Sequence, residues 1–460
     1  MKKITAVFLL IICIFAFSSC SPGKADDISS SGSDNTISRI ETKQDKFNIF
    51  PRGDSSSVSE EAAIVSDITA DDVKELEGGS PYSASDIFPE QVSGEFIAKD
   101  GFCYTAINDT QKSIYRRMDK IAAGMHTGFV VLGKYEMSDI VVAFSALRTD
   151  RPEYYWLSNQ FACGYIAGST AVAFDYKNDN IDISYLCTAD ERTSFNAKLK
   201  YALEKYLSSL SDDMSEYEKE LVLHDALVSS IVYDKAAAAD FTNNPFAFTA
   251  YGALVNGTAI CEGYSRAFQL LMKCVGIDCT LITGSSKEQG HMWNKVKIEN
   301  EWYNVDATWD DDDTYIFHTY FNISDKMIAN DHDVHSDYSE LSTEQLEKFD
   351  DFNIALPDCT SLKNNYAIIN KSYISSRNDF ADVTSSVLIE KAKNGICEAE
   401  FVFGEDCPLV FSLDGENSIT DLLEDDDVLR SVNKHLSRSN SINNIYISGV
   451  PGSKGFLLKW

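Results

Sequence analysis

Basic residues are scarce in this sequence, which has 40 Lys and Arg against 71 Asp and Glu and a formal net charge of −31. Proteins that bind nucleic acid through a basic face concentrate Lys and Arg on that face, so this class is excluded. The same shortage disfavours electrostatic docking on anionic membranes. An acidic surface attracts cationic substrates or keeps an exposed protein soluble, and we interpret the charge here mainly as a solubility feature.

The apolar stretch near the start, residues 6–17, is too short to cross a membrane and follows two lysines. This length and charge are typical of the apolar core of a secretory signal peptide. The stretch ends in FSSC, which resembles the lipobox of bacterial lipoproteins, so we predict a signal peptide at 1–19 and a lipid on Cys20. A plain signal-peptidase site is the alternative. A lipidated Cys20 places the protein on the extracellular face of the cell membrane, or on the periplasmic side in a Gram-negative cell.

Aromatic residues are few between residues 21 and 82, where Ser, Asp and Gly predominate. Such a segment buries too little apolar surface to form a core and is typical of a flexible tether. A chain of 460 residues has room for two or three domains. We expect a lipid-anchored linker at 20–84, an N-terminal α+β region at 85–190, a central domain at 191–340 and a small C-terminal α+β domain at 360–460.

Apolar periodicity divides the folded part into helices and strands. Helices are expected at 109–125, 138–148, 191–210, 379–393 and 419–436. Strands are expected at 154–156, 164–176, 181–186, 277–284, 366–374, 399–403, 444–448 and 456–460. Ser215 and Glu218 have the spacing of a capping box and mark the start of a further helix. The C-terminal domain shows no residue pattern that points to chemistry.

The segment GTAICEGYSRAFQLLMKCVG, which begins at Gly257, predicts a helix that starts at Cys261. Apolar residues recur at helical spacing after Cys261 and end at Gly276, while Gly257 permits a turn before the helix. At a helix N-terminus, unpaired backbone N–H groups and the macrodipole stabilise a thiolate, and the same groups can stabilise an oxyanion. A cysteine on an amphipathic helix is more often a core residue, so the motifs that follow decide its interpretation.

Two later motifs supply the partners that a cysteine nucleophile requires. GHMWNKV contains His291, and EWYNVDATWDDD contains Asp306, each on a short predicted strand. An imidazole activates the thiol, and a carboxylate fixes the tautomer of that imidazole. In the second strand we expect Tyr303 and Val305 to face inward and Asp306 to lie on the opposite, more polar face. Taken singly, His291 is typical of a strand histidine whose hydrogen bonds are satisfied, and Asp306 is typical of a residue that caps a turn. Together with Cys261, they indicate a catalytic triad.

These motifs resemble the transglutaminase-like superfamily, particularly its exported bacterial members. The shared pattern is a cysteine that opens a helix, then H-x-W-N, then W-Y-x-V-D-x-T-W-D-D. The resemblance covers about residues 215–335 and extends loosely to DRPEYYW at 150–156. Two positions depart from the family pattern: Met292 replaces a small residue, and Asn304 stands where histidine is common.

The resemblance implies an α+β fold with a papain-like core and assigns 191–340 as a transglutaminase-like catalytic domain. It also implies that Cys261, His291 and Asp306 are an intact triad. It implies no substrate, because the superfamily includes transamidases, peptidases, deamidases and members with no known activity.

Trp293 and Trp309 either line the substrate cleft or fill the core, and we carry both as candidate substrate-binding residues. His224 lies beside Asp225 on a predicted helix and is expected to be structural.

No cofactor and no metal are expected. Four consecutive aspartates, 310–313, lack the alternating ligands and Gly turn of a calcium loop and indicate a solvated loop. The segment Asp331-His332-Asp333-Val334-His335 lacks a second ligand pair with zinc spacing. Among 11 cysteines, eight remain beside Cys13, Cys20 and Cys261, and their pairing stays open.

The sequence therefore predicts a surface-anchored thiol enzyme that acts on peptide or carboxamide bonds through a thioester acyl-enzyme. Hydrolysis is favoured over transamidation because a bacterial surface presents peptides, including cell-wall peptide, as substrates. Its contact with the membrane is expected through the lipid alone. The competing hypothesis is a catalytically inactive module that has kept the fold and binds a wall polymer or another protein at the cell surface.

Overall fold

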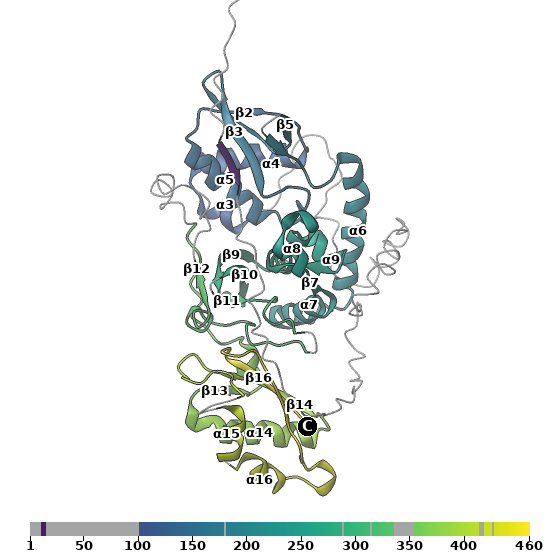
Figure 1. Ribbon diagram of the computed structural model, residues 1–460, viewed down its shortest axis with the longest axis vertical. Helices are drawn as coiled ribbons and strands as arrows, with labels where there is room; N and C mark the ends of the chain where they lie inside the picture. Colours follow the sequence, from purple (N-terminus) through teal and green to yellow (C-terminus); the bar gives the residue numbers. More distant parts are fainter. Residues whose placement is uncertain are drawn as a thin grey trace, which may run out of the picture. The chain divides into compact units, whose positions relative to one another are not determined.

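The computed structural model of the 460-residue chain describes residues 101–460 except 179–180, 288, 313–314, 335–353, 414–417 and 426, together with the backbone of 11–14. The chain divides into two compact units, and each is described by itself. Unit 1 comprises Met1–Asn294 and Val334–Leu356, and unit 2 comprises Lys295–Asp333 and Pro357–Trp460. Helices and strands are both abundant, which confirms the α+β class (Figure 1). The domain boundaries drawn from the sequence remain predictions.

Unit 1 begins with helices that accompany a four-stranded antiparallel sheet. The strands are ordered β1-β3-β4-β2, and Phe144, Phe161 and Phe174 pack together in the core beside them. The elements are α3 (Phe102–Ala106), α4 (Asp109–Ala123), β2 (Val130–Gly133), α5 (Met137–Asp150), β3 (Gln160–Ile166) and β4 (Ser169–Ala173), with β1 (Ile11–Ile14) paired to β3. The two helices expected at 109–125 and 138–148 are thus confirmed. β1 falls in the predicted signal peptide, and that assignment stays a prediction.

Two strand predictions in this region were wrong. The strand expected at 164–176 is broken by a turn in which Ala167 and Gly168 both have positive φ, so the chain reverses between β3 and β4. Residues 154–156 form a turn in place of a strand, because Tyr155 and Trp156 pack edge to face in a buried aromatic cluster. A short hairpin of β5 (Tyr176–Asn178) and β6 (Ile181–Ile183) follows.

Two capped helices lead to the cysteine. They are α6 (Ala189–Leu207) and α7 (Glu216–Ser230), each opened by a complete capping box, and that of α7 joins Ser215 and Glu218 as predicted. Short elements connect them to α10 (Cys261–Cys274): β7 (Val232–Tyr233), α8 (Lys235–Ala239), η2 (Phe241–Asn243), η3 (Pro245–Phe248), α9 (Ala250–Leu254) and β8 (Thr258–Ala259). Gly257 has a φ of 68°, which confirms the predicted turn.

The strand β9 (Cys279–Ser286) follows α10 and is adjacent to β10 (Gln289–Ile298), which carries His291. Gly263 allows α10 to lie close to the preceding segment, because a Cβ there would stand 2.3 Å from the carbonyl oxygen of Ala247. β10 continues into unit 2, where it is adjacent to β11 (Glu301–Val305). Asp306 comes directly after β11.

Unit 2 contains the sheet β13-β14-β16-β15, whose one face is covered by helices α14 to α16 (Figure 1). Its further elements are α11 (Asp325–Ile328), β12 (His332–Val334), α13 (Tyr366–Ile369), β13 (Tyr373–Ile374), η4 (Arg377–Asp379), α14 (Phe380–Lys393), β14 (Glu398–Phe403), α15 (Ile419–Asp425), α16 (Val428–Asn433), η5 (Arg438–Asn440), β15 (Tyr446–Ser448) and β16 (Gly455–Lys459). The expected strand at 366–374 was wrong over most of its length, because Asn365 caps a short helix there. The helix expected at 419–436 is two helices, since Asp427 adopts a left-handed conformation with φ 53°. Across the described residues, no helix combines the length and apolarity needed to span a membrane.

Asp150, at the end of α5, caps α3 from a buried position. Its carboxylate oxygens accept hydrogen bonds from the backbone N–H groups of Cys103 and Tyr104 at 3.0 and 2.8 Å. Burial raises the pKa of Asp150 to about 6, although these two N–H groups oppose the shift. The folded protein therefore holds a proton on Asp150 more tightly than the unfolded chain, in which the aspartate pKa is about 3.9.

Because the folded pKa is raised, the stabilisation by protonated Asp150 is complete below about pH 4 and is lost as the pH rises through about 6. The free energy of unfolding of the wild type, relative to Asp150→Asn, should therefore be greater at pH 4 than at pH 7, by up to about 3 kcal/mol. Urea unfolding across this range measures the difference. Asp190→Asn, which changes an exposed carboxyl on α6, is the control. Equal pH slopes for Asp150→Asn and wild type would contradict the assignment.

Candidate active site

Cys261 is the first residue of the 14-residue helix α10, as the sequence predicted, and Ile260 precedes it as N-cap. The cysteine is 3% exposed and belongs to a buried apolar cluster with Ile260, Leu281 and Met292. A sulfur at this position lies at the positive end of the helix dipole. This placement favours a thiolate, while the apolar surroundings limit its access to water.

Eight of the cysteines in the described part of the chain, among them Cys274 and Cys279, form no disulfide bond. Burial raises the pKa of the Cys274 thiol to about 12 and that of Cys279 well above its ordinary value, which makes both poor nucleophiles at neutral pH.

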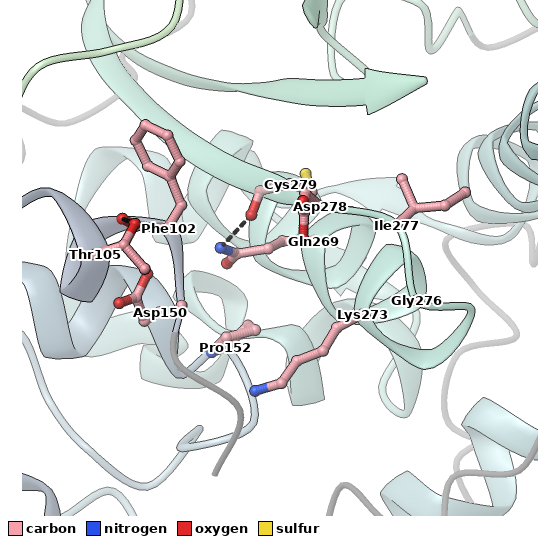
Figure 2. Close-up of a pocket in the computed structure, with 11 residues that line it drawn as sticks. Phe102, Thr105, Asp150, Pro152, Gln269, Lys273, Gly276, Ile277, Asp278 and Cys279 are labelled. Atoms are coloured by element: carbon pink, nitrogen blue, oxygen red, sulfur yellow. Dashed lines mark hydrogen bonds between the residues drawn. The ribbon is translucent and has the colours of Figure 1, made fainter. Parts of the chain in front are cut away.

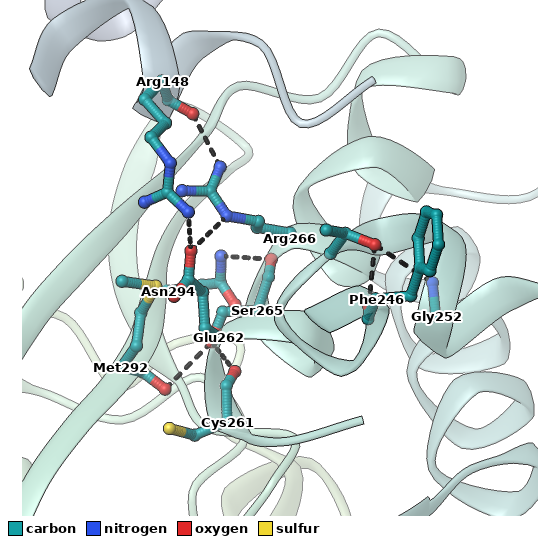
Figure 3. A network of polar contacts seen from close by, with 10 residues as sticks. Arg148, Phe246, Gly252, Cys261, Glu262, Ser265, Arg266, Met292 and Asn294 are labelled. Atoms are coloured by element: carbon teal, nitrogen blue, oxygen red, sulfur yellow. Dashed lines mark hydrogen bonds and ion pairs between the residues drawn. The ribbon is translucent and has the colours of Figure 1, made fainter. Parts of the chain in front are cut away.

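A buried charge cluster holds the first turn of α10 (Figure 3). One carboxylate oxygen of Glu262, Oε1, accepts hydrogen bonds from Arg148 at 2.6 Å and from Arg266 at 2.8 Å, and Arg266 also donates to the backbone carbonyl of Arg148. Burial lowers the pKa of Arg148 to about 10, with Glu262 opposing the shift, so both guanidiniums are charged at neutral pH. Two cations and one anion leave a net charge of +1, so the charge of Glu262, the acidic neighbour of Cys261, is more than neutralised.

The Cys261 sulfur points away from these guanidiniums in Figure 3, so the cluster fixes the helix and makes no direct contact with the thiol. Sequence reasoning missed the cluster. The i,i+4 spacing of Glu262 and Arg266 is a detectable signal. Nothing in the sequence links Arg148 to Glu262, because the two residues lie 114 positions apart.

The helix α10 is tied to the strand that carries His291. The Ser265 hydroxyl oxygen lies 2.9 Å from the carbonyl oxygens of both Cys261 and Met292, and Met292 is the neighbour of His291. The Asn294 amide donates to the carbonyls of Ser265 and Thr280, which adds β9 to the same contact. One hydroxyl and one amide thereby hold the cysteine helix and the histidine strand in register.

His291 is buried, and its ring stacks against Trp293 with centroids 6.1 Å apart. Trp293 itself is 0% exposed, which favours the core-filling alternative over a place in a substrate cleft. Trp309 is half-buried and contacts the rings of Tyr320 and His332. His224 is fully buried and pairs with Asp225 at 3.0 Å, as expected of a structural histidine.

Asp306 is 1% exposed in unit 2 and its carboxylate is engaged on both oxygens. Oδ1 accepts hydrogen bonds from the backbone N–H groups of Thr308 and Trp309, at 3.0 and 3.2 Å. Oδ2 is bonded to Nε2 of His332 at 3.0 Å. Tyr303 and Val305 are buried, as expected for the apolar face of β11. Asn304 and Asp306, which were expected on the more polar face, are buried as well, and the Asn304 amide donates a hydrogen bond to Asp325.

His332 is a site residue that sequence reasoning did not find. Its Nε2 bonds Asp306 and its Nδ1 bonds Asp331 at 2.7 Å, and its side chain is fully buried. Burial by itself lowers the pKa of His332, but the hydrogen bonds to the two carboxylates outweigh it and raise the pKa to about 9. The spacing of Asp331 and His332 had suggested only a weak zinc set. A doubly protonated imidazole offers no lone pair to a metal ion.

The acidic run at 310–313 differs from the solvated loop that its composition indicated. Asp310 is fully buried, and its Oδ1 accepts a hydrogen bond from the backbone N–H of Tyr320 at 2.9 Å. Asp311 and Asp312 are half-buried, and Asp313 and His335 lie outside the described residues. Asp310 thus organises the loop that follows Asp306.

Cys261 and His291 belong to unit 1, and Asp306 belongs to unit 2.

A pocket of about 180 Å³ in unit 1 lies elsewhere along α10. It is lined by Gln269 and Lys273 from the second half of that helix and by Asp150, and Figure 2 shows the Gln269 amide directed to the Cys279 carbonyl. Neither Cys261 nor His291 lines this pocket, so it is distinct from the candidate active site.

Ser265→Ala should lower the free energy of unfolding by about 1–3 kcal/mol, because it removes a buried donor shared by two carbonyl groups. It should also accelerate hydrogen exchange at the start of α10. Ser229→Ala is the matched control, since the Ser229 hydroxyl donates only within its own helix, to the Ala226 carbonyl. Urea unfolding and exchange mass spectrometry compare the two variants. Equal losses for both would show that Ser265 does not link α10 to β10.

Three comparisons relate the chain to known proteins. The family model "Transglutaminase-like superfamily" matches residues 204–307, a range that contains Cys261, His291 and Asp306. Kyphoscoliosis peptidase of Homo sapiens is 28% identical over 123 residues, covering 24% of this chain and 18% of that protein. The protein of the same name from Mus musculus is 27% identical over 124 residues, with the same coverage. The chain therefore spans less than a fifth of the length of these curated relatives.

Among solved structures, "Crystal structure of a TGase" aligns with 33% of this chain and 44% of its own, at 16% identity and a TM-score of 0.23. A score this low supports no structural conclusion. The family match falls on the segment from the second half of α6 to the residue after Asp306, which includes the helix opened by Cys261 and the strand that carries His291. In this segment, the chain carries a region that matches the transglutaminase-like superfamily.

Proposed function

We propose that the protein is a thiol enzyme that cleaves peptide or carboxamide bonds, with Cys261 as nucleophile, His291 as general acid and base, and Asp306 as the group that orients His291. The observation that carries the proposal is the first turn of α10. Cys261 opens the helix, and Ser265 ties that turn to the residue beside His291. The family match over residues 204–307 supports the same assignment.

In the proposed reaction, the Cys261 thiolate attacks the carbonyl carbon and forms a C–S bond, and the carbonyl oxygen takes the negative charge. Backbone N–H groups of the first turn of α10 would stabilise this oxyanion. Collapse breaks the C–N bond while imidazolium His291 gives its proton to the departing amine. Water then attacks the thioester and passes a proton to His291, and the carboxylic acid leaves as the thiolate is regenerated.

Hydrolysis is proposed over transamidation, with a protein or peptide as substrate, cell-wall peptide included. The curated relatives carry the name peptidase, which supports this choice without extending to their substrates. Whether water or an amine accepts the acyl group depends on how well the site excludes water. A peptide library and a cell-wall digest, read by mass spectrometry, separate cleavage from deamidation and crosslinking.

A catalytically inactive binding module is the second candidate, and one observation favours it. Cys261 is 3% exposed, so a substrate has little access to its thiol. Alkylation of Cys261 under reducing conditions distinguishes the two candidates. Rapid labelling at neutral pH supports the enzyme.

With reductant present, Cys261→Ala and His291→Ala should each abolish turnover, and the double variant should be little worse than either, because nucleophile and base act as a unit. Asp306→Asn should be milder, since it leaves both reacting groups. Alkylation rate against pH, in a Cys397→Ser background that removes an exposed free thiol, gives the reactivity of Cys261. If Cys261 reacts as an ordinary thiol with a midpoint near ~8.5, and loss of His291 changes nothing, the domain is a binding module.

We also propose that Cys20 carries a lipid and that residues 20–84 tether the catalytic domain to the cell surface. Support comes from the short apolar leader that ends in cysteine. Cys20→Ala should release the protein into the medium or periplasm, as judged by fractionation. Cys103→Ala, at a cysteine within the folded part, should leave the distribution unchanged. Membrane retention of Cys20→Ala at the wild-type level would contradict the anchor.

A further inference from the structure

We propose that His332 is a positioning residue for Asp306: its imidazolium donates one N–H to Asp306 and the other to Asp331, and it thereby holds the Asp306 carboxylate ionised and fixed in direction. The inference rests on the proposed role of Asp306 in catalysis. It extends the candidate triad to a fourth residue. The sequence motifs of the family match end at residue 307, so His332 lies outside them.

The burial of Asp306 creates the need for such a partner. A carboxylate that is 1% exposed loses its hydration, and it remains charged only when hydrogen bonds and a counter-charge replace water. Two backbone N–H groups, those of Thr308 and Trp309, satisfy Oδ1 but carry no net charge. His332 supplies the cation, with its Nε2 at 3.0 Å from Oδ2. Because a carboxylate oxygen accepts two hydrogen bonds, Oδ2 can also accept one from the proposed base.

The surroundings of His332 fix both its charge and its orientation. Asp331 accepts from Nδ1 at 2.7 Å, and the Tyr320 hydroxyl donates to the other oxygen of Asp331 at 2.5 Å. The Tyr320 ring packs edge to face on the imidazole, and Asp310 holds the Tyr320 backbone through its N–H. The titratable groups of unit 2 around His332 are Asp306, Asp331, Tyr320 and Asp310, with Asp333 next to it in the chain and the Lys454 ammonium interacting with Asp331. Carboxylates outnumber this one cation. This excess of negative charge keeps the imidazolium protonated and agrees with its raised pKa.

If His332 only forms a structural ion pair, its loss affects catalysis differently from the loss of a positioning residue. Loss of a structural pair lowers stability and leaves the catalysis of the folded fraction unchanged. Loss of a positioning residue lowers kcat while KM stays near the wild-type value, because ground-state substrate binding does not involve Asp306. His318 offers a matched control in the same unit, since it is also buried and pairs through Nδ1 with Glu400 at 3.0 Å.

The first measurement needs no turnover. The chain contains seven histidines, so ¹⁵N-histidine labelling gives a simple long-range ¹H–¹⁵N spectrum. We expect one imidazole to stay protonated on both nitrogens up to about pH 9 and to vanish from the His332→Gln spectrum. Asp306→Asn should lower the titration midpoint of that imidazole by at least about one pH unit, because a partner charge is lost. Titration of all seven histidines near or below about pH 7 would overturn the proposal.

The second measurement is kinetic, on reduced protein. His332→Gln, which keeps a donor for Asp306 but no charge, should lower kcat by about 10- to 100-fold with KM within about two-fold, and His332→Ala should lower kcat further. His318→Gln should leave both constants within about two-fold. Wild-type kcat in folded His332→Gln, or an equal loss in His318→Gln, would overturn the proposal. If His332→Gln does not fold, Asp331→Asn replaces it, because that variant keeps the His332–Asp306 bond and removes only one carboxylate. Asp331→Asn should lower the titration midpoint of His332 and reduce kcat. An unchanged midpoint would count against the proposal.

Failure of the proposed function gives a separate result. If Cys261→Ala retains turnover, Cys261 is not the nucleophile. The spectra of wild type and Asp306→Asn still decide whether His332 is the cation that holds Asp306. If Cys261→Ala abolishes turnover but His332 titrates as an ordinary histidine, the function stands and the positioning role fails.

Discussion

The buried oxygen of Glu262, shared by Arg148 and Arg266, is the constraint on which the position of Cys261 depends. A buried carboxylate without a cation is costly, so this cluster forms only when α5 and α10 are both in place. Twelve of the 14 residues of α10 are buried, which leaves the helix little freedom to shift. The position of Cys261 therefore depends on Arg148, a residue that lies outside the segment matched by the family model.

The position of Asp306, in unit 2, depends on a different kind of constraint. Asp306 follows β11 and is held by backbone N–H groups of its own turn, by His332 and by a loop that Asp310 braces against Tyr320. Here the local excess of carboxylates sets the protonation of the buried imidazole of His332. The acidity of the chain thus has a local role in addition to the solubility that its overall charge suggested.

The surroundings of Cys261 have opposing effects on the reactivity of its sulfur. The helix N-terminus and the net positive charge of the Glu262 cluster both favour a thiolate at Cys261. Burial of Cys261 opposes reactivity until substrate reaches the sulfur.

The sequence by itself determined the helix that starts at Cys261, the capping box at Ser215 and most helices of the described residues, because apolar spacing and capping residues act over a few positions. Its motifs also indicated the transglutaminase-like region that the family model matches. It did not predict the turn at Ala167–Gly168, the break at Asp427 or the packed turn at 154–156, where positive φ angles and aromatic packing override propensity. Only the tertiary structure decided that Arg148 pairs with Glu262, that Asp310 is buried and that His332 holds Asp306. Each of these groups is charged, and whether a charge is buried and paired depends on residues 10 to 114 positions away, a distance over which no local sequence pattern carries information.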